Sequence, residues 1–333
     1  MIVQPTAHYI EQAAQMLAAG GLIGLPTETV YGLAANANNA AAVAGIYALK
    51  GRPANHPVIV HLAPQTDVAH WVNNLPDYAH SLMHQAWPGP LTLVCQRTEH
   101  APDWVTGGQD TVGIRCPSHP VAQALLVAAA KLGVLGVAAP SANRFGRVSP
   151  TTAAHVEGEF TTPPLTLDGG ACEVGIESTI VDCTQTLPRI LRFGAISVED
   201  IKRITGLAVL DGVSNNAQNT APTTSPTTSP RVSGGLAAHY APNTPLSLVQ
   251  PTDAGKLANN TVYIGFIRPT ALPADCTFYA MPQDAARFAQ QLYAALRQLD
   301  DMAYAHIAVQ PVPDDDAWVG VADRLQRAAA TFL

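Results

Sequence analysis

The stretch "ALKGRPANHPVIVH", residues 48–61, joins the end of a predicted helix to the start of a predicted strand. Just before and within it, "NNAAAVAGIYALKG" has the asparagine start and the glycine stop of a helix, and "PVIVHLA" follows as a short β-rich run. Lys50 and Arg52 stand at this junction, and Lys50 is the only lysine of the first 130 residues. The helix–turn–strand order indicates an α/β fold. The two cations either complement the helix dipole or bind an anion.

The same alternation of helix and strand patterns extends through residues 1–207. Helices are predicted at "TAHYIEQAAQMLAAGG", at "SHPVAQALLVAAAKLG" with a serine cap, at "SPTTAAHV" with Pro150 in its first turn, and at "SVEDIKRITG", where Ser197 and Asp200 resemble a capping box. Short apolar runs predict the strands: "LIGL", "LTLVCQ", "TVGIRC", "VLGVAA", "LTLDGG", "STIVDC" and "RILRFG". This order predicts an α/β domain with a mixed sheet.

A linker and a second, smaller unit are predicted after this domain. Residues 211–235, "DGVSNNAQNTAPTTSPTTSPRVSGG", contain almost no large apolar residues, so residues 211–229 are expected to form a disordered tether. Beyond it, "VYIGFI", "TFYAM" and "HIAVQPV" read as strands, and "DAARFAQQLYAALRQLDDMA" reads as an amphipathic helix. We therefore expect a linker over residues 208–242 and a small α/β domain over residues 243–333.

Composition limits the class of protein. The chain has 333 residues and is 47% hydrophobic and 13% charged, which fits two domains with sizeable cores. No apolar stretch is long enough to predict a membrane span, and the N-terminus does not resemble a signal peptide. Five cysteines without a CxxC motif are typical of reduced thiols, so a cytoplasmic protein is expected. The net charge of -7 argues against nucleic-acid binding driven by overall charge.

The common motifs for nucleotide and metal binding are absent from the sequence. It contains no GxxxxGK[ST] and no GxGxxG between a strand and a helix, and it contains no HExxH, GxSxG or paired-cysteine zinc pattern. Cys172 and Cys183 lack further residues to complete a ligand set, so thiolate–metal binding is not expected. A nucleotide, if one is bound, requires a different kind of site.

Polar segments at the ends of predicted elements are the candidates for that site. They are "PTETVYGLA" (26–34), "KGRP" (50–53), "VGIRCPSHP" (112–120), "APSANRFGRVSP" (139–150) and "DGGACEVGIESTIVDC" (168–183). Each has a structural alternative: capping hydroxyls in a turn for the first, a dipole-complementing helix end for the second, and a surface loop for the fourth. Arg115, in the third, is either an edge-strand arginine that faces water or a bidentate grip on a carboxylate. Together with Arg192 of "RILRFG", these segments place six cations at element ends, where they could line one concave site: Lys50, Arg52, Arg115, Arg144, Arg147 and Arg192.

The order of these motifs resembles the YrdC-like threonylcarbamoyl-AMP synthases. "LPTETVYGLAANA", "IYALKGRPANHPVIVHL", "PGPLTLV", "VGIRCPSHP", "APSANRFGRVSPT", "GIESTIVD" and "ILRFGAIS" carry the resemblance, and "SPRVSGGLAAHYAPNTPL" resembles the long two-domain form. The resemblance implies a twisted, mixed open sheet with helices and a smaller Rossmann-like C-terminal domain. It also implies a nucleotidyltransferase that makes threonylcarbamoyl-AMP and pyrophosphate from L-threonine, bicarbonate (or CO2) and ATP.

Residue roles follow from the same resemblance. Lys50 and Arg52 would be catalytic, and ATP would be bound by Lys50, Arg52, Ser141, Asn143, Ser149 and Arg192. Threonine would lie near Thr29, Tyr31, His61, Arg115 and Ser178. Mg2+ would enter with ATP near Ser141 and Asn143, with no ligand set made of protein side chains alone. For His61, a hydrogen-bonded core histidine remains the alternative.

The resemblance also implies a lid and partners. Arg231 and Tyr240 in the linker would reach over the site and help to exclude water. A separate transferase complex would pass the threonylcarbamoyl group to the adenosine beside the anticodon of tRNA, so contact with tRNA would be indirect. We expect a monomer or weak dimer. The rival functions are a double-stranded RNA-binding or tRNA-binding module without catalysis, and carbamoyl transfer in hydrogenase maturation, which comes with extra domains and cysteine clusters that this chain lacks.

Overall fold

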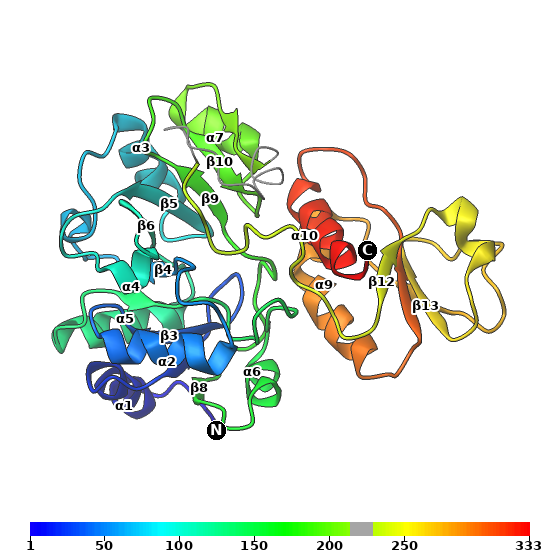
Figure 1. Cartoon of the computed structure of the whole chain (residues 1–333), viewed down its shortest axis with the longest axis horizontal. Coiled ribbons are helices and arrows are strands. Elements are labelled where there is room, and N and C mark those ends of the chain that lie inside the picture. Colours follow the sequence, from blue (N-terminus) through cyan, green and yellow to red (C-terminus); the bar gives the residue numbers. More distant parts are fainter. Residues whose placement is uncertain (214–228) are drawn as a thin grey trace.

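The computed structural model of the chain describes residues 1–213 and 229–333, which form two units built on separate sheets (Figure 1). The larger unit ends with strand β11 (Leu210–Asp211), and the smaller unit begins with strand β12 (Leu246–Leu248). Most of the tether expected over residues 211–229 lies outside the described residues. No described helix is long and apolar enough to cross a membrane.

The larger unit is a mixed eleven-stranded sheet, as the sequence predicts. Strand β4 pairs in parallel with β6, whereas β5 pairs with β6 in antiparallel register. In spatial order the strands are β1 (Ile2–Val3), β8 (Leu165–Leu167), β2 (Ile23–Leu25), β3 (Gly32–Asn36), β7 (Val137–Ala138), β4 (Ile59–His61), β6 (Thr111–Arg115), β5 (Leu91–Gln96), β9 (Thr179–Asp182), β10 (Arg189–Arg192) and β11.

Helices cover both faces of this sheet. They are α1 (Ala7–Ala18), α2 (Ala40–Lys50), α3 (Asp77–Ala86), α4 (Asp103–Thr106), α5 (Pro120–Lys131), α6 (Ala153–Glu159) and α7 (Val198–Thr205), with a short 3-10 turn η1 (Val68–His70). Alternate residues of β3 point to opposite faces. Leu33 and Ala35 therefore join the core that contains residues of α2, whereas Ala34 joins the core beneath α1 and α5.

Two predicted helix starts are wrong. Helix α5 is capped by His119, whose Nδ1 accepts a hydrogen bond from the backbone N–H of Val121 at 3.2 Å, and not by a serine. Helix α6 begins after Thr152, so Pro150 lies before it and not in its first turn. The Pro150 carbonyl instead accepts a hydrogen bond from the Tyr31 N–H at 2.8 Å, which holds this segment in extended form beside the turn after β2. The predicted capping box of Ser197 and Asp200 is confirmed in α7.

The smaller unit is a four-stranded sheet in which every pairing is parallel. Its strands, in spatial order, are β12, β15 (His306–Val309), β13 (Thr261–Gly265) and β14 (Thr277–Ala280), and its helical segments are η2 (Pro251–Lys256), α9 (Ala285–Asp300), α10 (Val319–Ala329) and η3 (Ala330–Phe332). The core of this unit also contains Val30, Val148 and Ile176 of the larger unit and Tyr240 of the linker. The two units are therefore joined by a shared hydrophobic core.

Candidate active site

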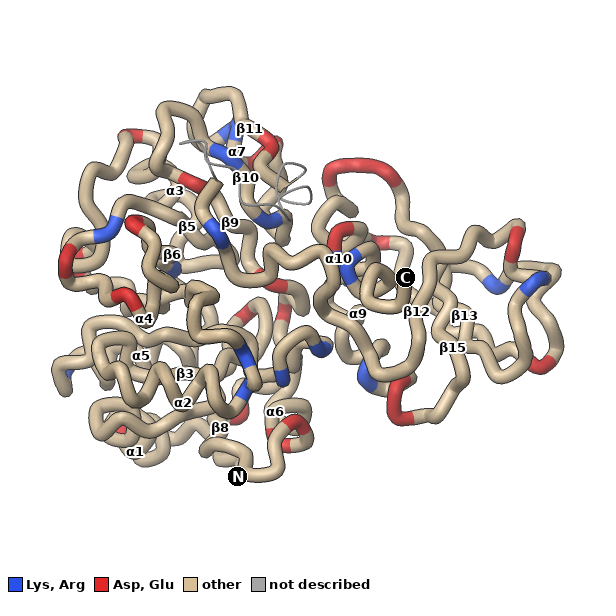
Figure 2. Tube along the Cα trace, in the orientation of Figure 1, with Lys and Arg blue, Asp and Glu red and all other residues tan. Residues whose placement is uncertain are grey.

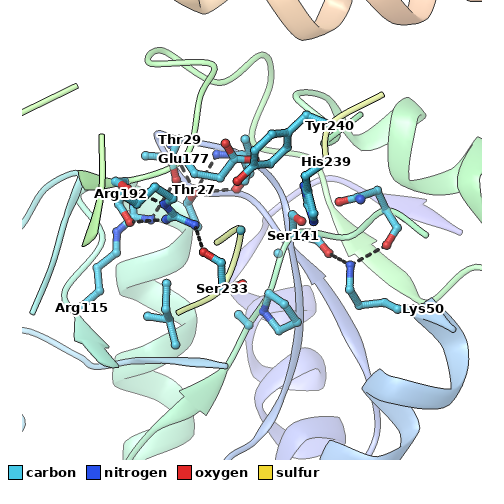
Figure 3. Close-up of a pocket in the computed structure, with 18 of the residues that line it drawn as sticks. Thr27, Thr29, Lys50, Arg115, Ser141, Glu177, Arg192, Ser233, His239 and Tyr240 are labelled. Atoms are coloured by element: carbon cyan, nitrogen blue, oxygen red, sulfur yellow. Dashed lines mark hydrogen bonds between the residues drawn. The ribbon is translucent and has the colours of Figure 1, made fainter. Parts of the chain in front are cut away.

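A buried polar pocket lies between the larger unit and the linker (Figure 3). Four of its lining residues are cations: Lys50, Arg52, Arg115 and Arg192. The other lining residues are Thr27, Thr29, Val30, Gly32, Ile59, His61, Ala139, Pro140, Ser141, Asn143, Phe145, Glu177, Ser178, Ser233, Gly234, His239 and Tyr240. The free volume is ≈ 40 Å³, compared with roughly 300–1,000 Å³ in typical ligand pockets. The pocket is therefore nearly closed in this conformation.

Lys50 connects two walls of the pocket. Helix α2 ends at Gly51, which caps it in the left-handed conformation at φ 61°, so the preceding side chain leaves the helix toward the loop after β7. Lys50 Nζ donates hydrogen bonds to the carbonyl oxygens of Ser141 and Asn143, at 2.5 Å each. Burial lowers the pKa of Lys50 well below its ordinary value, and the charge of Arg52 lowers it further. The ammonium thus bonds to another loop and not to the last carbonyls of its own helix, and one of its three N–H groups is left for a ligand.

Arg52 and Arg192 both bind the linker. The guanidinium of Arg52 donates to the Pro57 carbonyl at 2.8 Å and to Ser233 Oγ at 3.3 Å, and its buried Nε has no hydrogen-bond partner. Arg192 donates to the Ser233 carbonyl at 2.8 Å and to both the carbonyl and the hydroxyl of Ser178 at 3.0 Å. Ser233 therefore occupies the space between these two arginines.

Arg115 is buried in an ion pair with Glu28. Strand β6 lies between β4 and β5, so the alternative of an edge-strand arginine that faces water is wrong. Its NH2 donates to Glu28 Oε1 at 2.7 Å and its NH1 to Thr29 Oγ1 at 2.9 Å, and both charged side chains are only 4% exposed. Burial acts to raise the pKa of Glu28, but the charge and hydrogen bond of Arg115 outweigh it, and the pKa is lowered. The guanidinium is thus oriented by a carboxylate of the chain itself.

His61 lies beside Arg115 because the two residues are paired in the parallel register of β4 and β6. Burial lowers the pKa of His61 to about 3, and the neighbouring Arg115 charge contributes to the shift. The imidazole is therefore neutral near pH 7. Its buried Nδ1 has no hydrogen-bond partner.

Asn143 presents an unused oxygen within the same pocket. Its Nδ2 donates to the carbonyls of Arg144 and Arg147, at 2.7 and 2.9 Å, and this fixes which side of the amide carries the oxygen. The buried Oδ1 atom has no hydrogen-bond partner. An unpaired buried acceptor is costly unless a ligand, an ion or water completes it.

Ten of the thirteen site residues expected from the sequence line this pocket, and Tyr31, Ser149 and Arg231 do not. The Tyr31 hydroxyl donates to the Gly170 carbonyl at 2.8 Å, and Ser149 lies behind Glu177. Arg231 is exposed and donates to the Gly107 carbonyl at 2.9 Å, at the edge of the closed linker. The candidate cations Arg144 and Arg147 line a neighbouring cleft against α9.

Sequence reasoning missed three lining residues, Glu177, Ser233 and His239, and also Glu28, which holds the lining residue Arg115. Glu28 and Glu177 stand inside the quoted segments "PTETVYG" and "GIESTI", but no local signal marks either as the partner of a distant arginine. His239 precedes Tyr240 in "HYAP" and is 5% exposed, and Ser233 follows Arg231 in the linker. Ser233 stands between Val232 and Gly234, and His239 stands between Ala238 and Tyr240, so neither lies in a pattern that would predict burial in the pocket.

Figure 2 shows Lys and Arg positions scattered among Asp and Glu positions over both units. The fold and the site together define a two-unit α/β protein with a buried, cation-rich pocket between its larger unit and its linker.

Family comparisons identify the class more closely. Residues 15–194 match the Sua5–YciO–YrdC family model, described as "Telomere recombination", and residues 196–330 match the model described as "Threonylcarbamoyl-AMP synthase, C-terminal domain". The threonylcarbamoyl-AMP synthase of Pyrococcus abyssi is 34% identical, with 96% of this chain and 94% of that protein covered. The synthase of Bacillus subtilis is 36% identical, with 96% and 92% covered. The chain therefore belongs to the threonylcarbamoyl-AMP synthase family, a family of enzymes that use ATP.

The structural comparison agrees with the family assignment. The crystal structure of P. abyssi Sua5 complexed with L-threonine is 31% identical and matches with a TM-score of 0.87, covering 100% of this chain and 98% of that one. The expected YrdC-like fold with a smaller α/β C-terminal unit is confirmed.

Proposed function

We propose that this chain joins L-threonine, bicarbonate (or CO2) and ATP into threonylcarbamoyl-AMP and releases pyrophosphate, as a nucleotidyltransferase. The observation that carries the proposal is the convergence of Lys50, Arg52 and Arg192 on one buried pocket that also holds Arg115 with its carboxylate partner. One charged cluster suits a triphosphate, and the oriented guanidinium suits an amino-acid carboxylate. The crystal structure of P. abyssi Sua5, which is similar to this chain, is described as complexed with L-threonine.

The nucleotide half of the site would consist of Lys50, Arg52, Ser141, Asn143, Ser149 and Arg192. Lys50 would place its remaining N–H on a phosphate oxygen, and Arg52 would contribute the Nε that has no protein partner. Both cations lie in a desolvated site, where fixed charges act more strongly on developing phosphate charge than they would in water. We assign the catalytic role to these two residues.

The threonine half would consist of Thr29, Tyr31, His61, Arg115 and Ser178. Glu28 holds one edge of the Arg115 guanidinium, and the NH1 edge that now bonds to Thr29 would grip the threonine carboxylate. Neutral His61 offers its unpartnered Nδ1 to a donor group of threonine. Tyr31 would act from behind the pocket, through its bonds to the 169–170 turn.

Mg2+ would accompany ATP, and the residues present fit it. Mg2+ prefers oxygen ligands and usually keeps several waters and substrate phosphates, and the unpartnered Oδ1 of Asn143 is such an oxygen. The described residues contain no cluster of His, Cys, Asp or Glu that would bind a metal without the nucleotide. When bound, the ion would neutralise phosphate charge.

The proposed reaction has two bond-forming steps. The threonine amine forms an N–C bond with CO2 and loses a proton, which gives a carbamate. A carbamate oxygen then forms a bond to the α-phosphorus of ATP while the bond to the β-phosphate oxygen breaks, and pyrophosphate leaves with that electron pair. No side-chain nucleophile is required, so catalysis would rest on positioning and on charge stabilisation by Lys50 and Arg52.

We propose that the linker, residues 208–242, is a lid that joins a catalytic domain over residues 1–207 to a C-terminal domain over residues 243–333. Ser233, His239 and Tyr240 fill the pocket, whose ≈ 40 Å³ of free space is too small for ATP, so the linker would withdraw to admit it. Arg231 would hold the second half of the lid against the 107–109 turn. Closure over bound substrates would protect the carbamate and the mixed anhydride from water.

The test is a product assay with the full chain. Labelled bicarbonate should enter an adenylate only when threonine and ATP are both present, and pyrophosphate should appear in equal amount. Pyrophosphate release that does not depend on threonine would overturn the proposal. The product would then pass to a transferase that modifies tRNA, so only weak direct RNA binding is expected, and tight, steeply salt-dependent RNA binding without ATP would favour the RNA-binding alternative.

A further inference from the structure

Glu177 is the point at which the smaller unit reaches the pocket. Its Oε1 accepts a hydrogen bond from Ser149 Oγ at 2.5 Å. Its Oε2 accepts from the Tyr293 hydroxyl at 2.9 Å and from Arg324 Nε at 2.8 Å. Tyr293 belongs to α9 and Arg324 to α10, so one carboxylate joins two helices of the smaller unit to Ser149. Figure 3 shows Glu177 beside Tyr240 at the upper wall of the pocket.

Arg324 is fully buried and also reaches the linker. Its NH1 donates to the Phe193 carbonyl at 2.9 Å and to Asp323 Oδ2 at 2.7 Å. The guanidinium lies over the ring of Tyr240, 5.1 Å from the ring centroid. The same arginine therefore contacts the carboxylate that holds Ser149 and the aromatic ring that closes the pocket.

Close backbone packing fixes the segment that carries Glu177. A Cβ atom at Gly175, whose φ is +79°, would lie 2.4 Å from the Cα of Gln290 on α9. A Cβ atom at Gly320 on α10 would lie 3.0 Å from the Gly194 carbonyl oxygen. Helix α9 thus lies directly against the backbone two residues before Glu177, and α10 lies against Gly194, whose own Cβ atom would be 2.6 Å from the Glu177 carbonyl oxygen.

Electrostatics keep Glu177 charged. Burial acts to raise the pKa of this carboxyl, but the charges of Arg324 and Arg192 and the hydrogen bond from Ser149 outweigh it and lower the pKa to about 2. An ionised carboxylate only accepts hydrogen bonds, so the Ser149 hydroxyl must donate to it. The rotamer of Ser149 is thereby held from the smaller unit.

We propose that Arg324 and Tyr293 are positioning residues for adenylate formation, which act through Glu177 to fix Ser149, so that the smaller unit completes the nucleotide half of the site. The inference rests on the proposed function, because it takes Ser149 as a nucleotide contact. Ser178, on the threonine side, is held by Thr92 and Arg192 and does not depend on the Glu177 side chain. Loss of this chain of contacts, from Arg324 and Tyr293 through Glu177 to Ser149, should therefore weaken the binding of ATP more than the binding of threonine.

Tyr293→Phe tests the contact between Tyr293 and Glu177, and Tyr263→Phe is its matched control. Both changes remove one hydroxyl from a fully buried tyrosine of the smaller unit, but the Tyr263 hydroxyl donates to the Val249 carbonyl at 3.1 Å, within that unit. Tyr293→Phe should lose more thermal stability than Tyr263→Phe, because its hydroxyl bonds to a charged carboxylate and not to a neutral carbonyl. Tyr293→Phe should raise the KM for ATP about tenfold, the effect of one hydrogen bond, and leave the KM for threonine within about twofold. Tyr263→Phe should change neither constant.

Arg324→Lys keeps the positive charge but loses the planar guanidinium that bonds to Glu177. It should raise the KM for ATP at least as much as Tyr293→Phe does.

A double-mutant cycle with Ser149→Ala shows whether the effect passes through Ser149. If it does, adding Tyr293→Phe to Ser149→Ala should not raise the KM for ATP further. The inference would be overturned if the increases in the KM for ATP caused by Tyr293→Phe and by Ser149→Ala multiply in the double variant. It would also be overturned if Tyr293→Phe and Tyr263→Phe have the same KM for ATP. A wild-type chain without threonine-dependent pyrophosphate release would instead contradict the proposed function itself.

Discussion

The Nζ atom of Lys50 lies 2.5 Å from the carbonyl oxygen of Ser141, although the two residues are 91 positions apart in the chain. This contact, with its companion to the Asn143 carbonyl, fastens the loop after β7 to the end of α2. Gly51 ends helix α2 directly after Lys50, so the Lys50 side chain lies at the end of the helix, beside this loop. Two carbonyls without a carboxylate compensate only a small part of the free-energy cost of burying the positive charge of an ammonium group. We infer that an anionic ligand supplies the missing charge.

The Glu28–Arg115 pair should contribute to stability as well as to threonine binding. Glu28→Ala leaves a buried guanidinium without its carboxylate, so the free energy of unfolding should fall by about 3–5 kcal/mol. Asp103→Ala is the control, because Asp103 pairs with Arg97 at the surface, and its loss should cost less than about 1 kcal/mol. Urea unfolding measures both. A double variant, Glu28→Ala with Arg115→Met, should recover much of the loss, and equal losses in the two single variants would contradict the buried pairing.

Closure of the lid should depend on the left-handed backbone conformation of Gly234. Gly234 has φ +79°, and a Cβ atom there would lie 2.2 Å from the Tyr240 hydroxyl, so Gly234→Ala should disfavour the closed linker. We expect kcat to fall about tenfold or more and protease cleavage within residues 229–242 to rise. Gly235→Ala is the matched control, because its nearest atom would be 3.3 Å away. The lid assignment fails if the protease cleaves both variants at the same rate and both have the same kcat.

Acid should weaken the fold through buried neutral histidines. Burial lowers the pKa of both His61 and His239 from 6.5 to about 3, so the folded state keeps them neutral while the unfolded state protonates them near pH 6.5. The unfolded state therefore binds more protons between these values, and stability present above about pH 6.5 is lost as the pH falls. Urea unfolding at about pH 7.5, 6 and 5 should show this decline. His239→Gln should make the decline shallower, and an unchanged slope would contradict a neutral buried His239.

Local sequence patterns were sufficient to predict the α/β class. Asn39 and Gly51 bound α2, and Ser197 and Gly206 bound α7, so these helices begin and end where short-range hydrogen bonds dictate. The starts of α5 and α6 were misplaced because more than one polar residue could serve as the cap. In "SPTTAAHV" it is Thr152, and not the earlier serine or proline, that bonds to the N–H of the third residue into the helix.

The long-range partners in the site could not be predicted from the sequence. Glu28 meets Arg115 across 87 positions, and Glu177 meets Arg324 across 147. No periodicity or cap signal spans such distances, because these contacts follow from strand order and from the docking of the two units. The sequence motifs identified ten of the residues that line the pocket, but not the carboxylates that hold the arginines.

The most direct test of the nucleotide site compares Lys50→Ala with Lys131→Ala in threonine-dependent release of pyrophosphate from ATP. Both lysines lie in the last turn of a helix, α2 and α5 respectively, so both would complement a helix dipole, worth roughly 0.3–1 kcal/mol. Only Lys50 reaches across the pocket. Lys50→Ala should lower the rate about 100- to 1,000-fold with a nearly unchanged melting temperature, and Lys131→Ala should match the wild-type rate. Equal rates in the two variants, or a loss in Lys50→Ala explained by unfolding alone, would contradict the assignment of Lys50 to the reacting phosphates.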